Sequence, residues 1–254
     1  MTNPRRSLHA LPWLLALGAA GSAGCAAGSD DVADQTSELG AAARRTRAGQ
    51  IRDVAARSGI TNAALLAGVA QVETGMAHCW SEATWACQGP RSSSCGGPVI
   101  AGAGDGACSA QQGGLGMFQF DGGTFAQTLA RDGAGVLELD GNISHAVDFL
   151  AGIVQQEVDG VGSRAQAIAW LNAVPIARGN PQFVRWSKLL ACRYNGACGS
   201  TSQADKYAGA TLSVFGEFGS GFWTPPPPRP APEWYALSGD WDGDGTRTPG
   251  LYNV

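Results

Sequence analysis

The feature that most constrains this chain is a short apolar helical segment that ends in an acid. Residues 60–75 carry Thr61 or Asn62 as the expected N-cap and Gly75 as the expected helix stop. One face of this helix gathers its large apolar side chains and the acid, namely Leu65, Leu66, Val69, Val72 and Glu73. We therefore expect the helix to be buried in a helical core, with the Glu73 carboxyl at the edge of that core.

A carboxyl in such a position has an unusual electrostatic environment. Desolvation disfavours the ionised form and raises the pKa of a carboxyl, which suits a general acid near neutral pH. No basic residue lies within a helical turn of Glu73 to oppose this effect. The alternative is structural, because many glutamates near a helix end are solvated or pair with a lysine or arginine that the fold brings in.

Helical periodicity recurs along the chain, and little of it alternates as a strand does. The segments with helical patterns are 46–58, 62–74, 142–158, 163–173, 181–193 and 202–216. The pattern predicts a mainly α-helical domain over residues 45–223. A stretch rich in Cys, Gly and Ser, from Cys79 to Gly114, interrupts this domain, and we expect two internal disulfides to order it as a loop insertion.

The first 25 residues are typical of a bacterial export signal. Two arginines, Arg5 and Arg6, precede an apolar run, and small residues lead to Cys25. A cysteine in that position resembles the lipobox of bacterial lipoproteins, in which it is lipidated and anchors the protein to a membrane. The alternative is ordinary signal cleavage that leaves Cys25 as a spare thiol. Residues 26–44 have the composition of a flexible tether.

Cysteine number agrees with lipidation of Cys25, because the chain has seven cysteines and the other six form an even set. An even set in an exported protein indicates disulfides. Pairing of sequence neighbours is the simplest expectation, although the sequence leaves other pairings open: 79 with 87, 95 with 108, and 192 with 198. Zinc binding is the weaker alternative, since no C-x-x-C motif is present.

Charge argues against nucleic acid as a partner. The formal net charge is −4, and removal of residues 1–24, which carry two arginines and no acids, makes it −6. A nucleic-acid-binding domain of this size usually carries a basic surface instead.

Three further segments follow the apolar helix and carry polar groups in apolar or glycine-rich surroundings. They are Gly113–Phe120, Asn142–Leu150 and Ala191–Gly196. In the first of them, Gln119 can hydrogen-bond a sugar amide or hydroxyl, while the glycines let a ligand approach the main chain. The alternative is a glycine-rich turn with a core glutamine that the main chain satisfies.

Taken in order, the four segments resemble the soluble lytic transglycosylase family of the lysozyme-like superfamily. That family has a catalytic Glu followed by Ser, then G-L-M-Q-I, N-I-x-x-G-x-x-Y-L and A-Y-N-x-G. The resemblance covers residues 46–216. The chain departs from the family at several positions, with Thr for Ser, Phe for Met and Ile, Ala for Gly and Arg before the Tyr-Asn pair: Thr74, Phe118, Phe120, Ala146 and Arg193. The gap between Glu73 and Gln119 is also longer than usual in the family.

The resemblance implies a lysozyme-like fold and cleavage of the β-1,4 bond between MurNAc and GlcNAc in peptidoglycan glycan strands. Glu73 would act as the single acid and base, and a 1,6-anhydro ring would form without a catalytic cofactor. Tyr194 would hydrogen-bond near Glu73. The residues that the resemblance assigns to substrate binding are Gln119, Tyr194, Asn195, Phe118 and Thr74.

Two other functions remain open from the sequence. A muramidase acting on the same bond would need a second carboxylate, for which the candidates are Asp121, Glu82 and Asp105. A non-catalytic surface lipoprotein that binds the cell wall is the other alternative. The aromatic residues Trp80 and Trp85 are further candidates for contact with sugar.

The C-terminal part begins with a proline-rich linker, residues 224–232, and continues with a fragment, residues 233–254. Within the fragment, a D-x-D-x-D-G motif formed by Asp240, Asp242 and Asp244 has oxygen-ligand spacing that suits Ca²⁺. The fragment resembles one partial unit of a VCBS or integrin-type repeat. The acid expected at position 12 of a calcium loop is absent, so a solvated acidic turn is the alternative.

Overall fold

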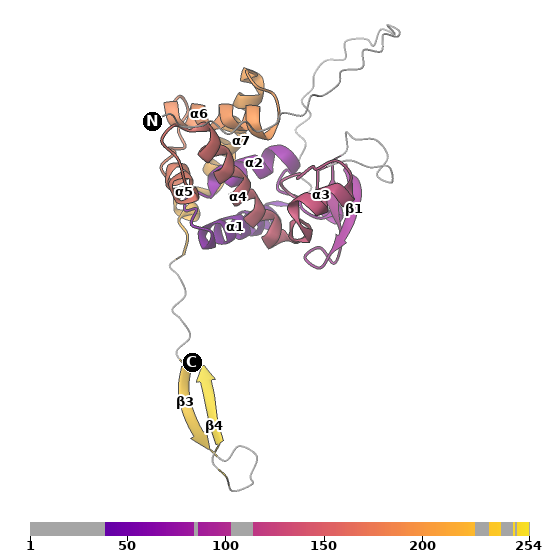
Figure 1. Ribbon diagram of the computed structural model, residues 1–254, viewed down its shortest axis with the longest axis vertical. Coiled ribbons are helices and arrows are strands. Elements are labelled where there is room, and N and C mark those ends of the chain that lie inside the picture. The colour runs from indigo at the N-terminus through magenta and orange to yellow at the C-terminus, as the bar shows by residue number, and fades with distance from the viewer. Residues whose placement is uncertain are drawn as a thin grey trace, which may run out of the picture. The chain divides into compact units, whose positions relative to one another are not determined.

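The computed structural model describes residues 39–83, 86–102, 114–226, 234–239, 246 and 248–253. Most of residues 39–226 is helical, as the periodicity predicts (Figure 1). The α-helices in this part are α1 (Ala41–Arg57), α2 (Ala64–Thr74), α3 (Phe125–Asp132), α4 (Leu139–Glu157), α5 (Arg164–Asn172), α6 (Pro181–Leu189), α7 (Thr201–Phe218) and α8 (Ser220–Trp223). Shorter helical turns are η1 (Trp80–Glu82), η4 (Ala134–Leu137) and η5 (Leu190–Tyr194). The mainly α fold class is therefore confirmed.

Helix α1 begins earlier than the sequence predicts. Residues 41–44, expected to belong to a flexible tether, form its first turn. Arg44 fixes this turn, because its guanidinium lies 2.7 Å from the Glu217 carboxylate and 2.9 Å from the amide oxygen of Gln71. The folded part thus includes residues that composition alone assigns to a linker.

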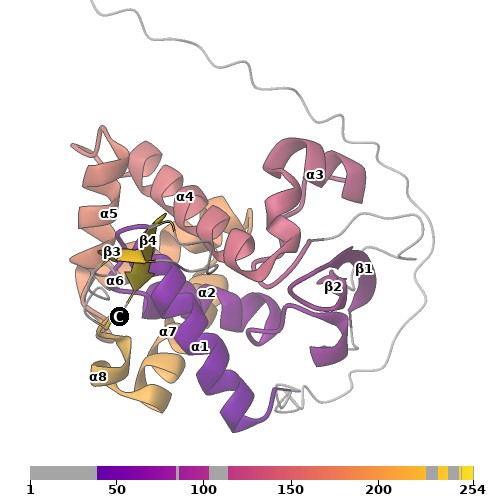
Figure 2. The ribbon, with the colours of Figure 1, turned by 90° about the horizontal axis from the view of Figure 1, so that it is seen from below.

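Helix α2 is the central element, and it packs most extensively against α7 (Figure 2). The crossing point is Gly68, where an added Cβ would lie 2.0 Å from Thr211 Oγ1 and 2.7 Å from Thr211 Cα. Leu65, Leu66 and Val69 on the same helix are fully buried. A glycine is needed here because the two helix backbones approach too closely for any side chain.

The ends of α2 agree only partly with expectation. Gly75 terminates the helix in the left-handed conformation, with φ of 60°, as predicted. The N-cap position is Ala63, however, so the prediction of Thr61 or Asn62 is wrong. The amide oxygen of Asn172 accepts hydrogen bonds from the backbone N–H groups of Thr61 and Asn62, at 2.8 and 3.3 Å. A side chain from α5 therefore fixes the two residues that lead into α2, while no side chain caps the helix itself.

The insertion after α2 contains a hairpin rather than only a loop. Strands β1 (Cys87–Ser92) and β2 (Gly97–Ala101) pair antiparallel, with an irregular register between Gln88 and Arg91. Gly89 permits this pairing, since an added Cβ would lie 2.4 Å from the Val99 carbonyl oxygen. We call residues 87–101 the β1–β2 hairpin. Its strands lack the polar and apolar alternation from which a strand is predicted.

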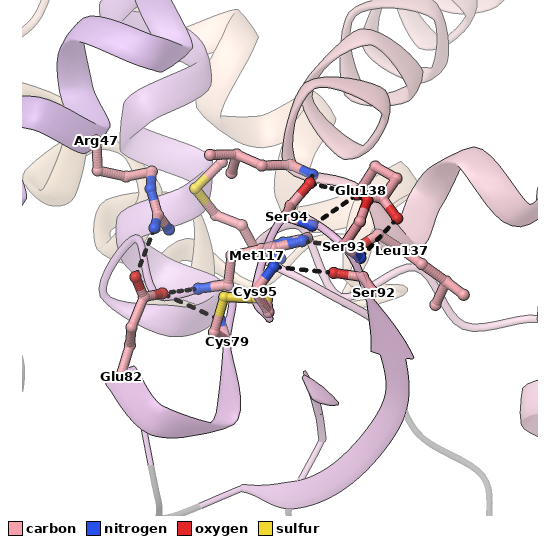
Figure 3. Close-up of a disulfide and its surroundings, with 12 residues drawn as sticks. Arg47, Cys79, Glu82, Ser92, Ser93, Ser94, Cys95, Met117, Leu137 and Glu138 are labelled. Atoms are coloured by element: carbon pink, nitrogen blue, oxygen red, sulfur yellow. Dashed lines mark hydrogen bonds and ion pairs between the residues drawn. A yellow bond between two sulfur atoms is a disulfide. The ribbon is translucent and has the colours of Figure 1, made fainter. Parts of the chain in front are cut away.

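The disulfides differ from the pairing of sequence neighbours. Cys79 is bonded to Cys95, which contradicts the expected pairs 79 with 87 and 95 with 108 (Figure 3). The pair Cys192–Cys198 is confirmed. Cys87 is disulfide-bonded as well. The Cys79–Cys95 bond ties the tip of the β1–β2 hairpin to the chain just after α2.

The C-terminal fragment forms its own antiparallel pair, β3 (Trp234–Gly239) with β4 (Thr248–Asn253). The three acids of the expected calcium motif, Asp240, Asp242 and Asp244, lie outside the described residues, as do the lipobox cysteine Cys25 and most of the proline-rich linker. No helix within the described ranges has the length and apolar character required to cross a membrane.

The close α2–α7 approach gives a first prediction. We expect Gly68→Ala to lower the free energy of unfolding by about 1–3 kcal/mol, because the new methyl group overlaps Thr211 and forces the helices apart. Gly152→Ala in α4 is the matched control, since an added Cβ there meets nothing within 4 Å. That variant should be unchanged or more stable by about 0.5–1 kcal/mol in urea unfolding. Equal stability of both variants would contradict this account of the crossing.

Candidate active site

Glu73 lies in the last turn of α2, half-buried at the edge of the core. The hydroxyl of Tyr207 donates a 2.6 Å hydrogen bond to its Oε1 atom. Burial raises the pKa of Glu73, while the Tyr207 hydrogen bond and the positive charge of Lys206 oppose the rise. The direction of the shift matches the expectation from sequence, and it is the direction that suits a general acid.

Tyr207 belongs to none of the four sequence motifs. It is fully buried on α7, on the face that contacts α2, together with Ala204, Thr211 and Val214. The spacing of these four residues marks a buried helical face, and a lone phenol on such a face needs a hydrogen-bond partner. That signal could have indicated a polar partner, but not which one, because Glu73 is 134 residues away in the chain.

Tyr194 occupies a related position but makes a different bond. It ends η5, a π-helical turn that continues α6, and its hydroxyl donates to the backbone carbonyl of Phe118. Its ring packs edge-on against the Tyr207 ring, with centroids 6.4 Å apart. Burial, and then the nearby Glu73 carboxyl, raise the pKa of Tyr194. Tyr194 is thus near Glu73, as predicted, whereas the direct hydrogen bond to the acid comes from Tyr207.

Gln119 lies in a strained turn, residues 115–120, which we call the Gln119 turn. Its backbone has φ of 51°, and the preceding Gly116 has φ of 70°. The side-chain amide of Gln119 donates to the Gly116 carbonyl at 2.8 Å. A Cβ on Gly116 would lie 2.4 Å from Asn142 Nδ2. Glycine is therefore required there. The bond to the Gly116 carbonyl is the main-chain contact that the structural alternative predicts, and the binding of a sugar by the half-buried Gln119 stays a prediction.

Buried side chains hold the backbone of this turn on several sides. Thr74 donates to the Met117 carbonyl at 2.9 Å, and His78 accepts from the Met117 N–H at 3.2 Å. Asn142 accepts from the Phe118 N–H at 3.1 Å and donates to the Val136 carbonyl at 2.8 Å. The turn is therefore fixed by groups from α2, from the chain that follows it and from α4.

Two residues expected to contact substrate serve this framework instead. The Phe118 ring is fully buried in the core, so it is not available to contact a sugar as the resemblance implies. Thr74 is also buried, and its hydroxyl is bonded to the Ala70 and Met117 carbonyls, so it is not free for a ligand. Asn195, by contrast, is exposed after η5, and the Cys192–Cys198 disulfide closes the loop that carries it.

His78 is fully buried, and both of its ring nitrogens have partners. Nδ1 accepts from the Met117 N–H, so Nε2 must carry the proton that it shares with the Leu137 carbonyl at 2.9 Å. Burial lowers the pKa of His78 to about 4. A neutral histidine with a fixed tautomer thus joins the Gln119 turn to η4, which agrees with a structural rather than a catalytic role.

The other acids considered from the sequence do not join Glu73. Glu82 forms a 2.6 Å ion pair with Arg47 and accepts from the backbone N–H groups of His78 and Cys79 (Figure 3). Asp121 is exposed and accepts from the N–H of Gly123 at 2.7 Å. Asp105 lies outside the described residues. In the described part of the chain, no second carboxylate is among the groups that shift the pKa of Glu73.

Glu138, the residue before α4, holds the tip of the β1–β2 hairpin against the helices. Its carboxylate accepts from the backbone N–H and hydroxyl groups of Ser93 and Ser94 at the hairpin tip (Figure 3). These bonds lower the pKa of Glu138 to about 2. Trp80 is half-buried and packs on a small alanine-rich cluster, and Trp85 lies outside the described residues.

Two hollows in the described surface lie away from Glu73. One, of about 130 Å³, lies between α6 and α7, and the other, of about 360 Å³, is lined by residues of α5, α7 and α8. Within the described ranges, no group of three or more His, Cys, Asp or Glu side chains is arranged to hold a metal ion. Direct contacts link Glu73, Tyr207 and Tyr194, and the Tyr194 hydroxyl connects them to the turn that carries Gln119. These four residues form the candidate site.

No protein-family model, no curated protein and no solved structure matches the chain. The chemistry of the candidate site is accordingly argued from its own residues.

The buried His78 gives a prediction for acid stability. Because its pKa in the folded state lies below the usual 6.5, its contribution is complete above pH 6.5 and is lost as the pH falls through about 4. We expect a loss of about 3 kcal/mol in the free energy of unfolding across this window. His78→Gln should abolish most of that pH dependence in urea unfolding, whereas His145→Gln should leave it in place. An unchanged acid loss in His78→Gln would contradict the assignment.

The Tyr207 hydrogen bond gives a prediction for the acid itself. The bond favours the carboxylate, so Tyr207→Phe should raise the pKa of Glu73 further. A ¹³C NMR titration of the Glu73 carboxyl would measure this change directly. Tyr194→Phe is the matched control, since that hydroxyl is bonded to a backbone carbonyl, and its effect should be smaller. Equal shifts in both variants would show that the Tyr207 bond is not the specific cause.

Proposed function

We propose that the chain is a peptidoglycan-cleaving enzyme whose helical domain is lysozyme-like. More specifically, we propose a lytic transglycosylase that cleaves the β-1,4 MurNAc–GlcNAc bond and forms a 1,6-anhydro product. The observation that carries the proposal is the setting of Glu73, a half-buried carboxyl with a raised pKa and one phenolic hydrogen bond. The order of the four sequence motifs supports the same assignment.

The proposed reaction uses Glu73 twice. Its carboxyl first protonates the glycosidic oxygen, and the bond from that oxygen to C1 of MurNAc breaks as an oxocarbenium-like centre develops. The carboxylate then takes the proton of the C6 hydroxyl while O6 bonds to C1 and closes the anhydro ring. Glu73 ends protonated, so neither water nor a second acid is required.

The neighbours of Glu73 suit this sequence of steps. Tyr207 holds Oε1, which leaves Oε2 without a hydrogen-bond partner in the described part of the chain and available to the substrate. The same phenol stabilises the carboxylate after the first proton transfer. Gln119 would position the sugar through its amide oxygen, and Asn195 and Tyr194 would border the same site.

The cellular setting is part of the proposal. The export signal and disulfides suit a protein outside the cytoplasm, and lipidation of Cys25 would attach it to a membrane of the cell envelope. Its partner there would be the glycan strands of the wall. Ca²⁺ bound by Asp240, Asp242 and Asp244 would play no part in the reaction.

Product analysis tests the proposed function. Purified sacculi incubated with the full chain should release 1,6-anhydro-muropeptides detectable by mass spectrometry, and Glu73→Gln should reduce the rate by about 10²–10⁴-fold. Glu217→Gln, which alters a surface acid paired with Arg44, is the matched control and should remain active. Products with reducing ends would indicate a hydrolase instead. Equal activity of Glu73→Gln and the wild type would refute the assignment of the acid.

A further inference from the structure

Phe149 on α4 is exposed in a way that sets it apart from the other large apolar residues in the described ranges. Phe149 is 40% exposed, and it is the single exposed large hydrophobic residue in those ranges. One exposed apolar residue needs no explanation by itself. The surroundings of Phe149, however, link it to the candidate site.

Phe149 belongs to a continuous series of ring contacts that begins at the acid. Tyr207, bonded to Glu73, contacts Tyr194, and the Tyr194 ring lies 5.5 Å from the Phe149 ring at an interplanar angle of 83°. The buried Phe120 ring also contacts Phe149, with centroids 6.2 Å apart and an interplanar angle of 73°. Both neighbours meet Phe149 edge to face, so neither is stacked parallel on it.

The two supporting rings come from separate elements that the fold fixes. Tyr194 is held by its hydrogen bond to Phe118, and Phe120 is held by antiparallel bridging to Leu115 and by a T-shaped contact with His145 at 4.5 Å. Phe149 is therefore ordered before any ligand arrives. Such preorganisation lowers the entropic cost of binding.

The surface beside the ring is open and has a polar border. Gly152, one turn further along α4, leaves space, since an added Cβ would meet nothing within 4 Å. Asp148 precedes Phe149 in the sequence, and it forms an exposed ion pair at 2.7 Å with Arg164, the first residue of α5. An apolar ring with polar groups at its margin is a common arrangement for recognising an amphipathic ligand.

We propose that Phe149 is a stacking platform for an N-acetylhexosamine ring of the glycan strand, in a subsite next to the bond that Glu73 cleaves. This inference rests on the proposed function for the identity of the sugar. A pyranose ring presents its axial C–H groups on one face and its hydroxyls around the edge. The C–H face would lie on Phe149, while the hydroxyls would reach the polar border.

Binding is the direct test, with Glu73→Gln as the parent protein so that the substrate is not consumed. Sedimentation with purified sacculi and calorimetric titration with chitohexaose, the β-1,4 hexamer of N-acetylglucosamine, would give the affinities. Phe149→Leu preserves an apolar side chain but removes the ring, and should weaken binding by about 3- to 10-fold. Phe149→Trp preserves an aromatic face and should bind within about twofold of the parent.

Phe222→Leu is the matched control, because the Phe222 ring packs on Phe218 of α7 and Trp223 of α8 and lies outside the ring series. It should bind as the parent does. Unchanged binding in Phe149→Leu, equal losses in Phe149→Leu and Phe222→Leu, or no binding by the parent would each overturn the proposal. If the wild type has no lytic activity but binding still depends on Phe149, the proposed reaction fails while the stacking site stands. If the wild type is active but Phe149→Leu binds normally, the stacking site is refuted while the proposed reaction stands.

Discussion

The rest of the structure depends on the close crossing of α2 and α7. Gly68 permits the two backbones to approach at Thr211, because any side chain at that position would overlap the opposite helix. Glu73 lies just over one turn beyond Gly68, and Tyr207 lies about one turn before Thr211. The crossing that buries the apolar face of α2 therefore also sets the Tyr207 hydroxyl 2.6 Å from the Glu73 carboxylate. The same helix crossing therefore determines both the packing of the core and the geometry of the candidate site.

Strand β2 extends that constraint to the Gln119 turn. The N–H of Ile100 donates to the His78 carbonyl at 3.0 Å. The carbonyl of Ile100 accepts from the N–H of Gly116, in the turn, at 2.9 Å. His78, Asn142 and Thr74 then satisfy the remaining polar groups of the turn from inside the core. A buried polar network of this kind specifies one conformation because each unpaired member would be costly. The insertion is thus a support for the candidate site and not an appended loop.

Sequence patterns predict the parts of this molecule that depend on local periodicity. The main helices follow from apolar spacing, and the position of Glu73 at the core edge follows from the same rule. Interactions between distant segments could not be predicted. The Tyr207 bond depends on a helix crossing, and the Cys79–Cys95 pairing depends on a hairpin without alternation. The chain before α2 is held by Asn172 of α5, which is about 110 residues away in the sequence. Burial of Thr74 was missed because a motif gives residue types, not the directions of side chains.

The polar groups around Glu73 are uncharged, which explains how a single carboxyl could serve the proposed reaction. Desolvation raises the pKa of Glu73 and lowers that of His78, so burial drives both groups toward their uncharged forms. It also raises the pKa values of Tyr194 and Tyr207, which keeps both phenols protonated as hydrogen-bond donors. The charge that develops on Glu73 after proton transfer would then be met by an oriented phenol rather than by a buried cation. A buried cation would lower the pKa of the carboxyl and remove the proton that the proposed reaction requires. The neighbouring cation, Lys206, is exposed, so solvent screens its effect and the carboxyl keeps its proton affinity.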